Sequence, residues 1–379
     1  MTTTLRFIVD QVVAPVPGPL GRYTVDLGRA LVESAPAGTA VEGIVSSSPE
    51  SDYERVRHEV PGLSDLYKTS LARRELLAAW QLGLTTSPGG GIIHAPSLFA
   101  PLRRHQREHG DQVVVTVHDV LAWTHPEAVS ATSVAWQKAM LKRARKHADA
   151  VVVPTHALAD QLSMVADFGD RVRVIGTAPR TGLRVDTDAA ERAARLGLPQ
   201  GGHLVVAGTL EPRTGLVDVL AALGRPGVPD VPLVVIGPGN WGEQHLATVA
   251  EEYGVAPTRV RHFEELDAAD LAVVLHGATA FVAPAHDAGA GTTLIEAFSL
   301  GTPVIHSDIP AYAETAAGAG LAVPVGVGDG FADRLAAAVT RVVEDREFAA
   351  RLAIAGSDRS RAFSWRDSAE RVWQLHADL

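Results

Sequence analysis

The chain has 379 residues and a formal net charge of −10, and 46% of its residues are hydrophobic. This length suits two α/β domains, each with its own core. The absence of cysteine excludes a disulfide scaffold, a thiol nucleophile and a cysteine-ligated metal. No window approaches 18 uncharged apolar residues, so we expect no membrane span. The sequence MTTTLRFIVDQ at the start lacks the features of a signal peptide, and the composition is typical of a bacterial cytoplasmic protein.

The charge is unevenly distributed. Residues 1–183 carry a net charge of +1, whereas residues 184–379 carry −11. The acidic second half argues against a nucleic-acid partner. The last of the four lysines is Lys146, so no lysine follows it in the second half.

Short β-branched runs alternate with Ala-rich amphipathic segments, which is typical of parallel sheets built from βαβ units. The predicted strands of the first half are residues 5–10, 40–46, 91–96, 112–119, 149–154 and 171–176. Predicted helices between them cover residues 22–33, 70–83, 132–148 and 157–165.

Residues 177–203 are rich in Gly, Pro, Asp and Thr around one short predicted helix at 189–196, and we interpret them as an interdomain linker. The second set of predicted strands covers residues 203–208, 232–237, 259–263, 278–284, 303–308 and 320–325. The chain then ends in predicted helices at 328–344, 348–355 and 364–376.

The pattern predicts an α/β fold with two Rossmann-like, doubly wound parallel-sheet domains. The expected bounds are 1–183 for an N-terminal domain, 184–362 for a C-terminal domain and 363–379 for a terminal helix. Ligands of such sheets bind at the carboxyl ends of the strands, so two facing sheets imply a site in the cleft between them.

Two glycine turns between a strand and a helix have competing interpretations. Gly18 and Gly21 stand before the first predicted helix, where backbone N–H groups bind an anion or form an ordinary tight turn. Residues 237–242 read G-x-G-x-x-G, and acidic residues follow about 20 positions on, as in a dinucleotide site. Pro238 and Trp241 disfavour that interpretation, because proline donates no N–H and tryptophan is bulky beside a pyrophosphate.

Two further loops open helices in the second half. Residues 208–216, GTLEPRTGL, place Arg213 where it faces a phosphate or is solvated. Residues 283–298 end a strand and lead through a Gly-rich loop into a helix near Thr292 and Thr293, whose N–H groups suit a phosphate. Glu296, one turn into that helix, is able to accept hydrogen bonds from two ribose hydroxyls or to act as a capping carboxylate.

Taken together, these motifs resemble glycosyltransferase family 4, which has the GT-B fold. The family's signature P-S-x-x-E-G-F-G-L-P-x-L-E-A-M-A-x-G-x-P-V is kept in register at Pro284, Gly289, Gly291, Glu296, Ala297, Gly301, Pro303 and Val304. Other family segments resemble the residues before Arg22-Tyr23 and those at 93–96, 117–119, 153–155, 208–215, 237–241 and 363–365. The match covers nearly the whole chain and implies that the terminal helix crosses back onto the N-terminal domain.

The resemblance implies roles for individual residues. Gly18 and Gly21 would line the diphosphate side of the cleft, and His118 would face the donor sugar, or else bond within its own loop. Arg213 would face the diphosphate, and Glu296 would hold the ribose. The remaining residues of the implied donor site are Gly208, Thr214, Gly289, Gly291, Thr292 and Thr293.

The sequence departs from the family at two important positions. Thr214 stands where the family has a lysine, and Ala288 stands where it has the first glutamate of a Glu-x7-Glu pair. A transfer reaction develops negative charge on the leaving diphosphate, and losing the lysine removes a few kcal/mol of electrostatic stabilisation. Arg213 is the only adjacent cation, and Asp287 is a stand-in candidate for the missing carboxylate.

The sequence therefore leaves two hypotheses. The first is a retaining, metal-independent glycosyltransferase that moves a hexose-type sugar from a nucleotide diphosphate donor to a saccharide, lipid or small molecule, without a further cofactor. The second is a catalytically impaired relative that binds a nucleotide or stabilises a partner protein. Thr214 and Ala288 favour the second, and the retained His118, Arg213 and Glu296 favour the first.

Metal and membrane sites are less well supported. Residues 186–188 imitate a D-x-D metal motif but lie in the predicted linker, where solvated acids are expected. Basic residues gather at 103–107 and again at Lys138, Lys142, Arg143, Arg145 and Lys146. The second group is a solvated helix face, or it presents a cationic face to anionic lipid at the inner face of the membrane or to a phosphorylated acceptor.

Overall fold

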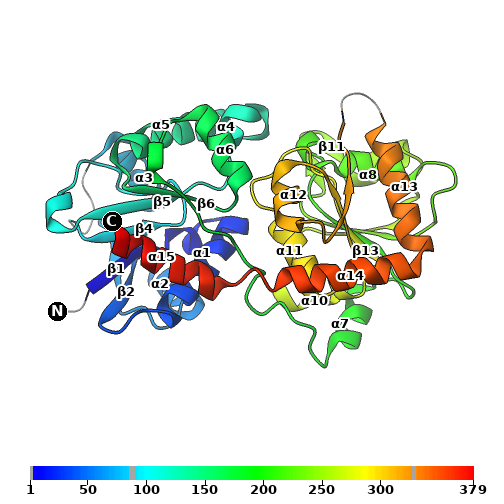
Figure 1. Ribbon diagram of the computed structural model, residues 1–379, viewed down its shortest axis with the longest axis horizontal. Coiled ribbons are helices and arrows are strands. Elements are labelled where there is room, and N and C mark those ends of the chain that lie inside the picture. Colours follow the sequence, from blue (N-terminus) through cyan, green and yellow to red (C-terminus); the bar gives the residue numbers. More distant parts are fainter. Residues whose placement is uncertain (1–2, 85–89, 327–329) are drawn as a thin grey trace. The chain divides into compact units, whose positions relative to one another are not determined.

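The computed structural model describes residues 3–84, 90–326 and 330–379. The chain forms two compact units, which are seen separately in Figure 1. The N-terminal unit comprises Met1–Thr177 and Ser364–Leu379, and the C-terminal unit comprises Ala178–Phe363. The sequence places the first boundary at residue 183, whereas in the structure residues 178–183 already belong to the C-terminal unit, because Arg180 is anchored there.

The N-terminal unit contains one sheet of seven parallel strands. The order is β3-β2-β1-β4-β5-β6-β7, so the winding direction changes between β1 and β4, as in a doubly wound fold. The strands are β1 (Thr3–Ile8), β2 (Thr39–Val45), β3 (Asp65–Lys68), β4 (Ile92–Ala95), β5 (Gln112–Thr116), β6 (Ala150–Val153) and β7 (Val172–Val174).

Helices connect and cover these strands. They are α1 (Gly18–Glu33), α2 (Glu50–Glu59), α3 (Arg73–Leu82), α4 (Leu121–Thr124), α5 (Ala131–His147), α6 (His156–Val165) and, from the end of the chain, α15 (Trp365–Asp378). The sequence did not predict α2 or β3. Only Tyr53 and Val56 of α2 are buried, and β3 is a four-residue edge strand with a charged residue at each end, so neither has a strong periodic pattern.

Helix α15 completes the hydrophobic core of the N-terminal unit. It packs against α1, and it contributes the buried side chains of Ala369, Val372 and Leu375. The indole Nε1 of Trp373 donates a hydrogen bond to the carbonyl of Leu31 at 3.2 Å. The terminal helix therefore belongs structurally to the sheet formed by the start of the chain, as the family resemblance implies.

The C-terminal unit contains six parallel strands in the order β12-β9-β8-β13-β14-β15. They are β8 (Leu204–Ala207), β9 (Leu233–Ile236), β12 (Val260–Phe263), β13 (Ala280–Ala283), β14 (Val304–Ser307) and β15 (Leu321–Val323). Its helices are α7 (Ala189–Leu196), α8 (Leu216–Leu223), α9 (Leu246–Glu252), α10 (Ala268–His276), α11 (Thr292–Ser299), α12 (Pro310–Ala316), α13 (Phe331–Glu344) and α14 (Arg346–Ser360). The start of α13 expected at residue 328 lies outside the described residues.

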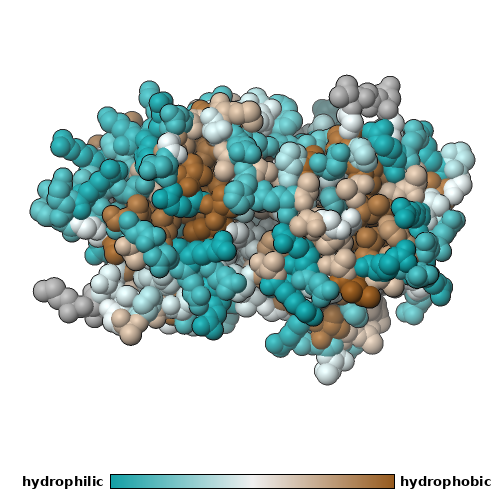
Figure 2. Space-filling model, in the orientation of Figure 1, coloured by the Kyte–Doolittle hydropathy of each residue, from teal (hydrophilic) through white to brown (hydrophobic). Residues whose placement is uncertain are grey.

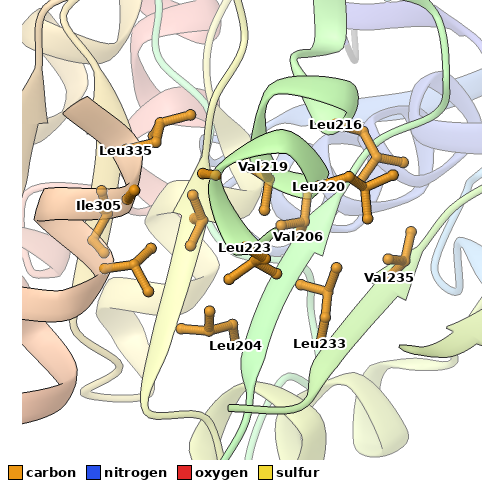
Figure 3. Packing of buried hydrophobic residues seen from close by; sticks show 14 of the residues in the cluster. Leu204, Val206, Leu216, Val219, Leu220, Leu223, Leu233, Val235, Ile305 and Leu335 are labelled. Carbon is orange, nitrogen blue, oxygen red and sulfur yellow. The ribbon is translucent and has the colours of Figure 1, made fainter. Parts of the chain in front are cut away.

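Apolar side chains on the strands and on the helices that cover one face of this sheet form its largest core. Figure 3 shows β8 and β9 packed against α8, with β14 and α13 beside them, through Leu204, Val206, Leu216, Val219, Leu220, Leu223, Leu233, Val235, Ile305 and Leu335. This packing fixes α8 and the loop before it, which belongs to the candidate site. The predicted fold class, two parallel-sheet α/β domains, is confirmed.

Hydrophilic residues cover most of the face seen in Figure 2, with hydrophobic residues between them. Among the residues that the structure describes, no helix has both the length and the apolar character required to cross a membrane.

Candidate functional site

The C-terminal unit has a pocket of about 150 Å³ beyond the carboxyl ends of β8 and β13, the end of a parallel sheet where ligands bind. The first turn of α11 forms part of its wall. Six of the residues implied by the family resemblance line it: Arg213, Thr214, Asp287, Gly291, Thr292 and Thr293. Ala288 and Tyr312 also line it, whereas Gly208, Gly289 and Glu296 are not among the lining residues.

The loop between β8 and α8 closely approaches the loop that follows β13. Gly215 has a positive φ of 73°, and a Cβ atom there would lie 2.2 Å from the carbonyl oxygen of Pro284. Only glycine fits this position, because a side chain would collide with backbone. The backbone N–H of His286 also donates a hydrogen bond to the carbonyl of Arg213 at 2.8 Å. The two loops therefore form one rigid wall of the pocket.

The Arg213 guanidinium is engaged within this wall. Its Nε donates to Oε1 of Glu211 at 2.8 Å, its Nη2 donates to Oε2 at 3.3 Å, and its Nη1 donates to the carbonyl of Asp287 at 2.9 Å. Glu211 is buried, so this is a largely desolvated ion pair. A phosphate bound in the pocket would meet a cation that is already neutralised by a carboxylate.

The Thr214 hydroxyl is turned into its own loop. Its oxygen lies 2.5 Å from the carbonyl of Thr209 and 2.9 Å from the carbonyl of Glu211. Since a hydroxyl has a single proton to donate, that proton serves the loop rather than a ligand. At the position where the resemblance implies a lysine, the structure has a neutral group that stabilises the loop.

Gly291 immediately precedes helix α11 as its N-cap and packs against Tyr312 of α12. Gly291 has a φ of 73°, and a Cβ atom there would lie 2.9 Å from the Tyr312 ring. Burial raises the pKa of Tyr312 to about 12, so its phenol stays protonated near neutral pH. Among the described residues, the hydroxyl has no hydrogen-bond partner. Sequence reasoning missed Tyr312, because no short motif marks it.

Glu296 lies one turn into α11 and is only 2% exposed. Both of its carboxylate oxygens contact Arg180: Nε donates to Oε1 at 2.6 Å and Nη2 donates to Oε2 at 3.2 Å. The backbone N–H of Arg180 lies 3.4 Å from Oε1 as well. The residue expected to hold a ribose is therefore held by an arginine that sequence analysis did not identify.

In the N-terminal unit, the glycine turn is part of α1. Gly18 is its first residue and has a φ of 56°. The N–H of Gly21 donates to the carbonyl of Pro17 at 2.8 Å, and a Cβ atom on Gly21 would lie 2.4 Å from Cβ of Pro17. The Gly21 amide is thus used within the turn, and this glycine is required for close packing.

His118 follows β5 and bonds to the loop after β4. Its Nε2 lies 2.7 Å from the carbonyl of Pro96, and its ring contacts Tyr23 edge-on at 4.5 Å between centroids. Because a carbonyl only accepts, Nε2 carries the proton and Nδ1 keeps its lone pair. Burial lowers the pKa of His118, so the neutral form predominates near pH 7.

Two alternative motifs have structural explanations. Residues 240–241 and 244–245 pair as a small antiparallel hairpin, β10 (Asn240–Trp241) and β11 (Gln244–His245), so no helix opens within this G-x-G-x-x-G segment. Asp186 pairs with Arg184 and Asp188 pairs with Arg192. Within the described part of the chain, no three His, Asp or Glu side chains are grouped to bind a metal.

Two family sequence models match the chain in succession. The model described as Glycosyltransferase Family 4 matches residues 20–178, and the model described as Glycosyl transferases group 1 matches residues 192–359. Each match lies almost entirely within one of the two structural units.

Named relatives are similar over the whole chain or part of it. The O-antigen chain mannosyltransferase B of Escherichia coli is 23% identical and covers 95% of each chain. The glycogen synthase of Mycobacterium tuberculosis is 27% identical and covers 95% of this chain and 91% of its own. The phosphatidyl-myo-inositol mannosyltransferase of Mycolicibacterium smegmatis is 30% identical over 44% of this chain and 42% of its own.

Solved structures share the fold. HepE of Anabaena, in complex with UDP and glucose, superposes over all of both chains with a TM-score of 0.74 at 16% identity. The sucrose-phosphate synthase of Thermosynechococcus elongatus has a TM-score of 0.71 at 21% identity, covering 99% of this chain and 98% of its own. Together with the family matches, these findings define a glycosyltransferase of the GT-B fold. More narrowly, the matches show a chain similar to the family 4 type of these proteins.

Proposed function

We propose that this protein is a retaining glycosyltransferase whose C-terminal unit binds a nucleoside diphosphate sugar. The observation that carries the proposal is the pocket at the start of α11, lined by Thr292, Thr293 and Arg213. The N–H groups of a helix's first turn and its dipole favour a phosphate. The similar fold of HepE, which was crystallised with UDP and with UDP-glucose, supports a nucleotide donor.

In the proposed reaction, an acceptor hydroxyl oxygen forms a bond to C1 of the sugar as the bond between C1 and the diphosphate breaks. Attack on the face that the diphosphate leaves retains the anomeric configuration. The proton of the acceptor passes to a phosphate oxygen, so the donor supplies its own base. In the N-terminal unit, the neutral Nδ1 of His118 is proposed to accept a hydrogen bond from a sugar hydroxyl.

A binding protein with impaired catalysis is a second candidate. Thr214 contributes no charge to the pocket, Ala288 contributes no carboxylate, and Arg213 is neutralised by Glu211. Preorganised charge is usually the largest contribution to catalysis of this kind, so a site with these groups would bind a nucleotide better than it turns it over. In this role, the protein would act by nucleotide binding or by stabilising a partner protein.

Calorimetry and thermal shift with UDP, GDP, ADP, TDP and their sugar conjugates, without added metal, test the proposal. Selective binding of one diphosphate with micromolar affinity supports a donor site and identifies the base. Slow release of free sugar from the matching conjugate then separates an enzyme from a binding protein. No binding at millimolar concentration would exclude the transferase.

The basic face of α5 supports a further proposal about location. Lys138, Lys142 and Lys146 recur every four residues, so they share one helix face with Arg145, and all four are exposed. We propose that this face contacts anionic lipid. The wild-type protein should sediment with vesicles that contain phosphatidylglycerol at low salt. The triple variant Lys138→Gln/Lys142→Gln/Lys146→Gln should stay in the supernatant. Equal binding of that variant would contradict the proposal.

A further inference from the structure

We infer that Arg180 sets how this protein recognises the sugar of a nucleotide, because it occupies the carboxylate of Glu296 that a ribose would use. The inference rests on the proposed donor site in the C-terminal unit. In that site, Arg180 is the residue that determines specificity for the ribose.

The ion pair has a two-point geometry. The planar fork of the Arg180 guanidinium matches the Glu296 carboxylate, with Nε 2.6 Å from Oε1 and Nη2 3.2 Å from Oε2. Such bidentate, charge-assisted contacts are stronger than hydrogen bonds between neutral side chains. The side chains are 14% and 3% exposed, so water screens the pair little.

Arg180 makes two further contacts besides this bidentate pair. Its Nη1 lies 3.5 Å from the carbonyl of Leu266, and its own N–H points at Oε1 of Glu296. The guanidinium is therefore held by two groups of the C-terminal unit, the Glu296 carboxylate and the Leu266 carbonyl, rather than by a single flexible contact.

Ribose and Arg180 compete for the same atoms. Two vicinal ribose hydroxyls would donate one hydrogen bond to each carboxylate oxygen, which is what Nε and Nη2 of Arg180 already do. Moving the guanidinium away would leave two buried charges apart, which is strongly unfavourable. Because the Arg180–Glu296 pair is retained, the ribose hydroxyls gain little, and nucleotide affinity depends on the phosphates and the base.

This inference predicts weak discrimination between a ribonucleotide and its 2′-deoxy analogue. The wild-type protein should bind UDP and 2′-deoxy-UDP, or the matching pair of another base, with dissociation constants within about threefold. Arg180→Gln removes the charged fork but keeps a polar partner, and frees the carboxylate for the hydroxyls. A hydrogen bond to a charged group is then gained, so the ribonucleotide should be preferred by about tenfold or more.

Two further variants complete the experiment. Arg184→Gln is the matched control, because Arg184 lies on the same segment, has a side chain that is 76% exposed and, within the described part of the chain, forms an ion pair only with Asp186. It should leave the ratio of dissociation constants unchanged. Glu296→Gln tests the same idea without removing Arg180. The affinity of this variant for the ribonucleotide should differ from that of the wild-type protein by less than about threefold. Melting curves of every variant confirm that the C-terminal unit is folded.

The outcomes separate this inference from the proposed function. If wild-type protein prefers the ribonucleotide tenfold and Glu296→Gln abolishes that preference, Arg180 does not block Glu296, although the donor site stands. If wild-type protein binds no diphosphate but Arg180→Gln does, the inference holds and a donor role for the native chain fails. If neither binds any diphosphate, both ideas are overturned.

Discussion

Nδ1 of His94 lies 3.2 Å from Nε2 of His376 in the core of the N-terminal unit, joining β4 to helix α15. Nδ1 of His376 lies 2.9 Å from Oε1 of Gln112, which only accepts, so this nitrogen carries the proton. Nε2 of His376 then accepts from His94. The other ring nitrogen of His94 is buried and has no partner among the described residues. The arrangement requires both rings to be neutral.

Acid should therefore weaken the N-terminal unit. Burial lowers the pKa of His376 to about 4 and lowers that of His94 as well. Above pH 6.5 both the folded and the unfolded states are neutral. As the pH falls from 6.5 towards 4, only the unfolded state takes up protons, so stability is lost across this window. The loss from His376 should be about 2 kcal/mol at pH 5 relative to pH 7.5.

Urea unfolding followed by tryptophan fluorescence measures this loss, because five of the six tryptophans belong to the N-terminal unit. His376→Gln replaces the titrating ring by a neutral group of similar reach. Its stability should vary less between pH 7.5 and pH 5. An equal variation in both proteins would assign the effect to other groups.

A lysine at position 214 should strengthen diphosphate binding. Thr214→Lys places a cation on a residue that lines the pocket. It also removes the hydroxyl bonds to the loop, at a cost of about 1 kcal/mol in stability. We expect an affinity for the diphosphate at least about tenfold higher, measured by calorimetry. Thr187→Lys adds the same charge at an exposed position, and a comparable gain there would mean that only net charge matters.

Loss of the Arg213 guanidinium should destabilise the C-terminal unit as well as weaken phosphate binding. Arg213→Gln leaves Glu211 buried without its partner, which should cost about 3 kcal/mol. The double variant Glu211→Gln/Arg213→Gln should recover part of this stability but not the binding. If Arg213→Gln melts at the same temperature as the wild-type protein, the Arg213–Glu211 pair makes no net contribution to the stability of the C-terminal unit.

Gly291→Ala should close part of the pocket. The new methyl group would lie 2.9 Å from the Tyr312 ring, in a backbone conformation that favours glycine. Gly318→Ala is the matched control, since Gly318 has a φ of 87° but no atoms within 4 Å of a Cβ. We expect about 1 kcal/mol of strain in both and an additional loss of nucleotide affinity only at position 291. Equal affinities in the two variants would contradict this.

The neutral phenol of Tyr312 should contribute to ligand binding rather than to folding. Tyr312→Phe removes a hydroxyl that has no partner among the described residues, so the melting temperature should change little. Affinity for the diphosphate should fall about fivefold, as expected for one lost neutral hydrogen bond. Unchanged affinity would show that the hydroxyl does not reach the ligand.

The sequence predicted the elements with strong periodicity and the loops with distinctive composition. Helix α7 lies at the predicted residues 189–196, and the predicted strands of both sheets begin within two residues of their predicted starts. The Gly-rich loop before Thr292 was also recognised, because glycine at a strand end signals close approach of the backbone.

Partners that lie far apart in the chain were not predictable. Arg180 and Glu296 are separated by 116 residues. Arg180 lies in a segment that the sequence analysis interpreted as a linker, and no local pattern there indicates an ion pair with the Glu296 carboxylate. Tyr312 was missed for the same reason. Single residues that converge on a pocket are positioned by the packing of helices, which leaves no local pattern.

The path of the chain has a consequence for biosynthesis. The chain leaves the N-terminal unit at Thr177 and returns only at Ser364, so the C-terminal unit is an uninterrupted segment. On the ribosome, that later segment is complete while the earlier sheet still lacks the side chains of α15 that fill its core. Whereas an N-terminal domain usually folds first during synthesis, the core of this N-terminal unit is completed only by the last residues to be made. Until α15 is available, the apolar side chains that it covers in the folded N-terminal core remain without that partner.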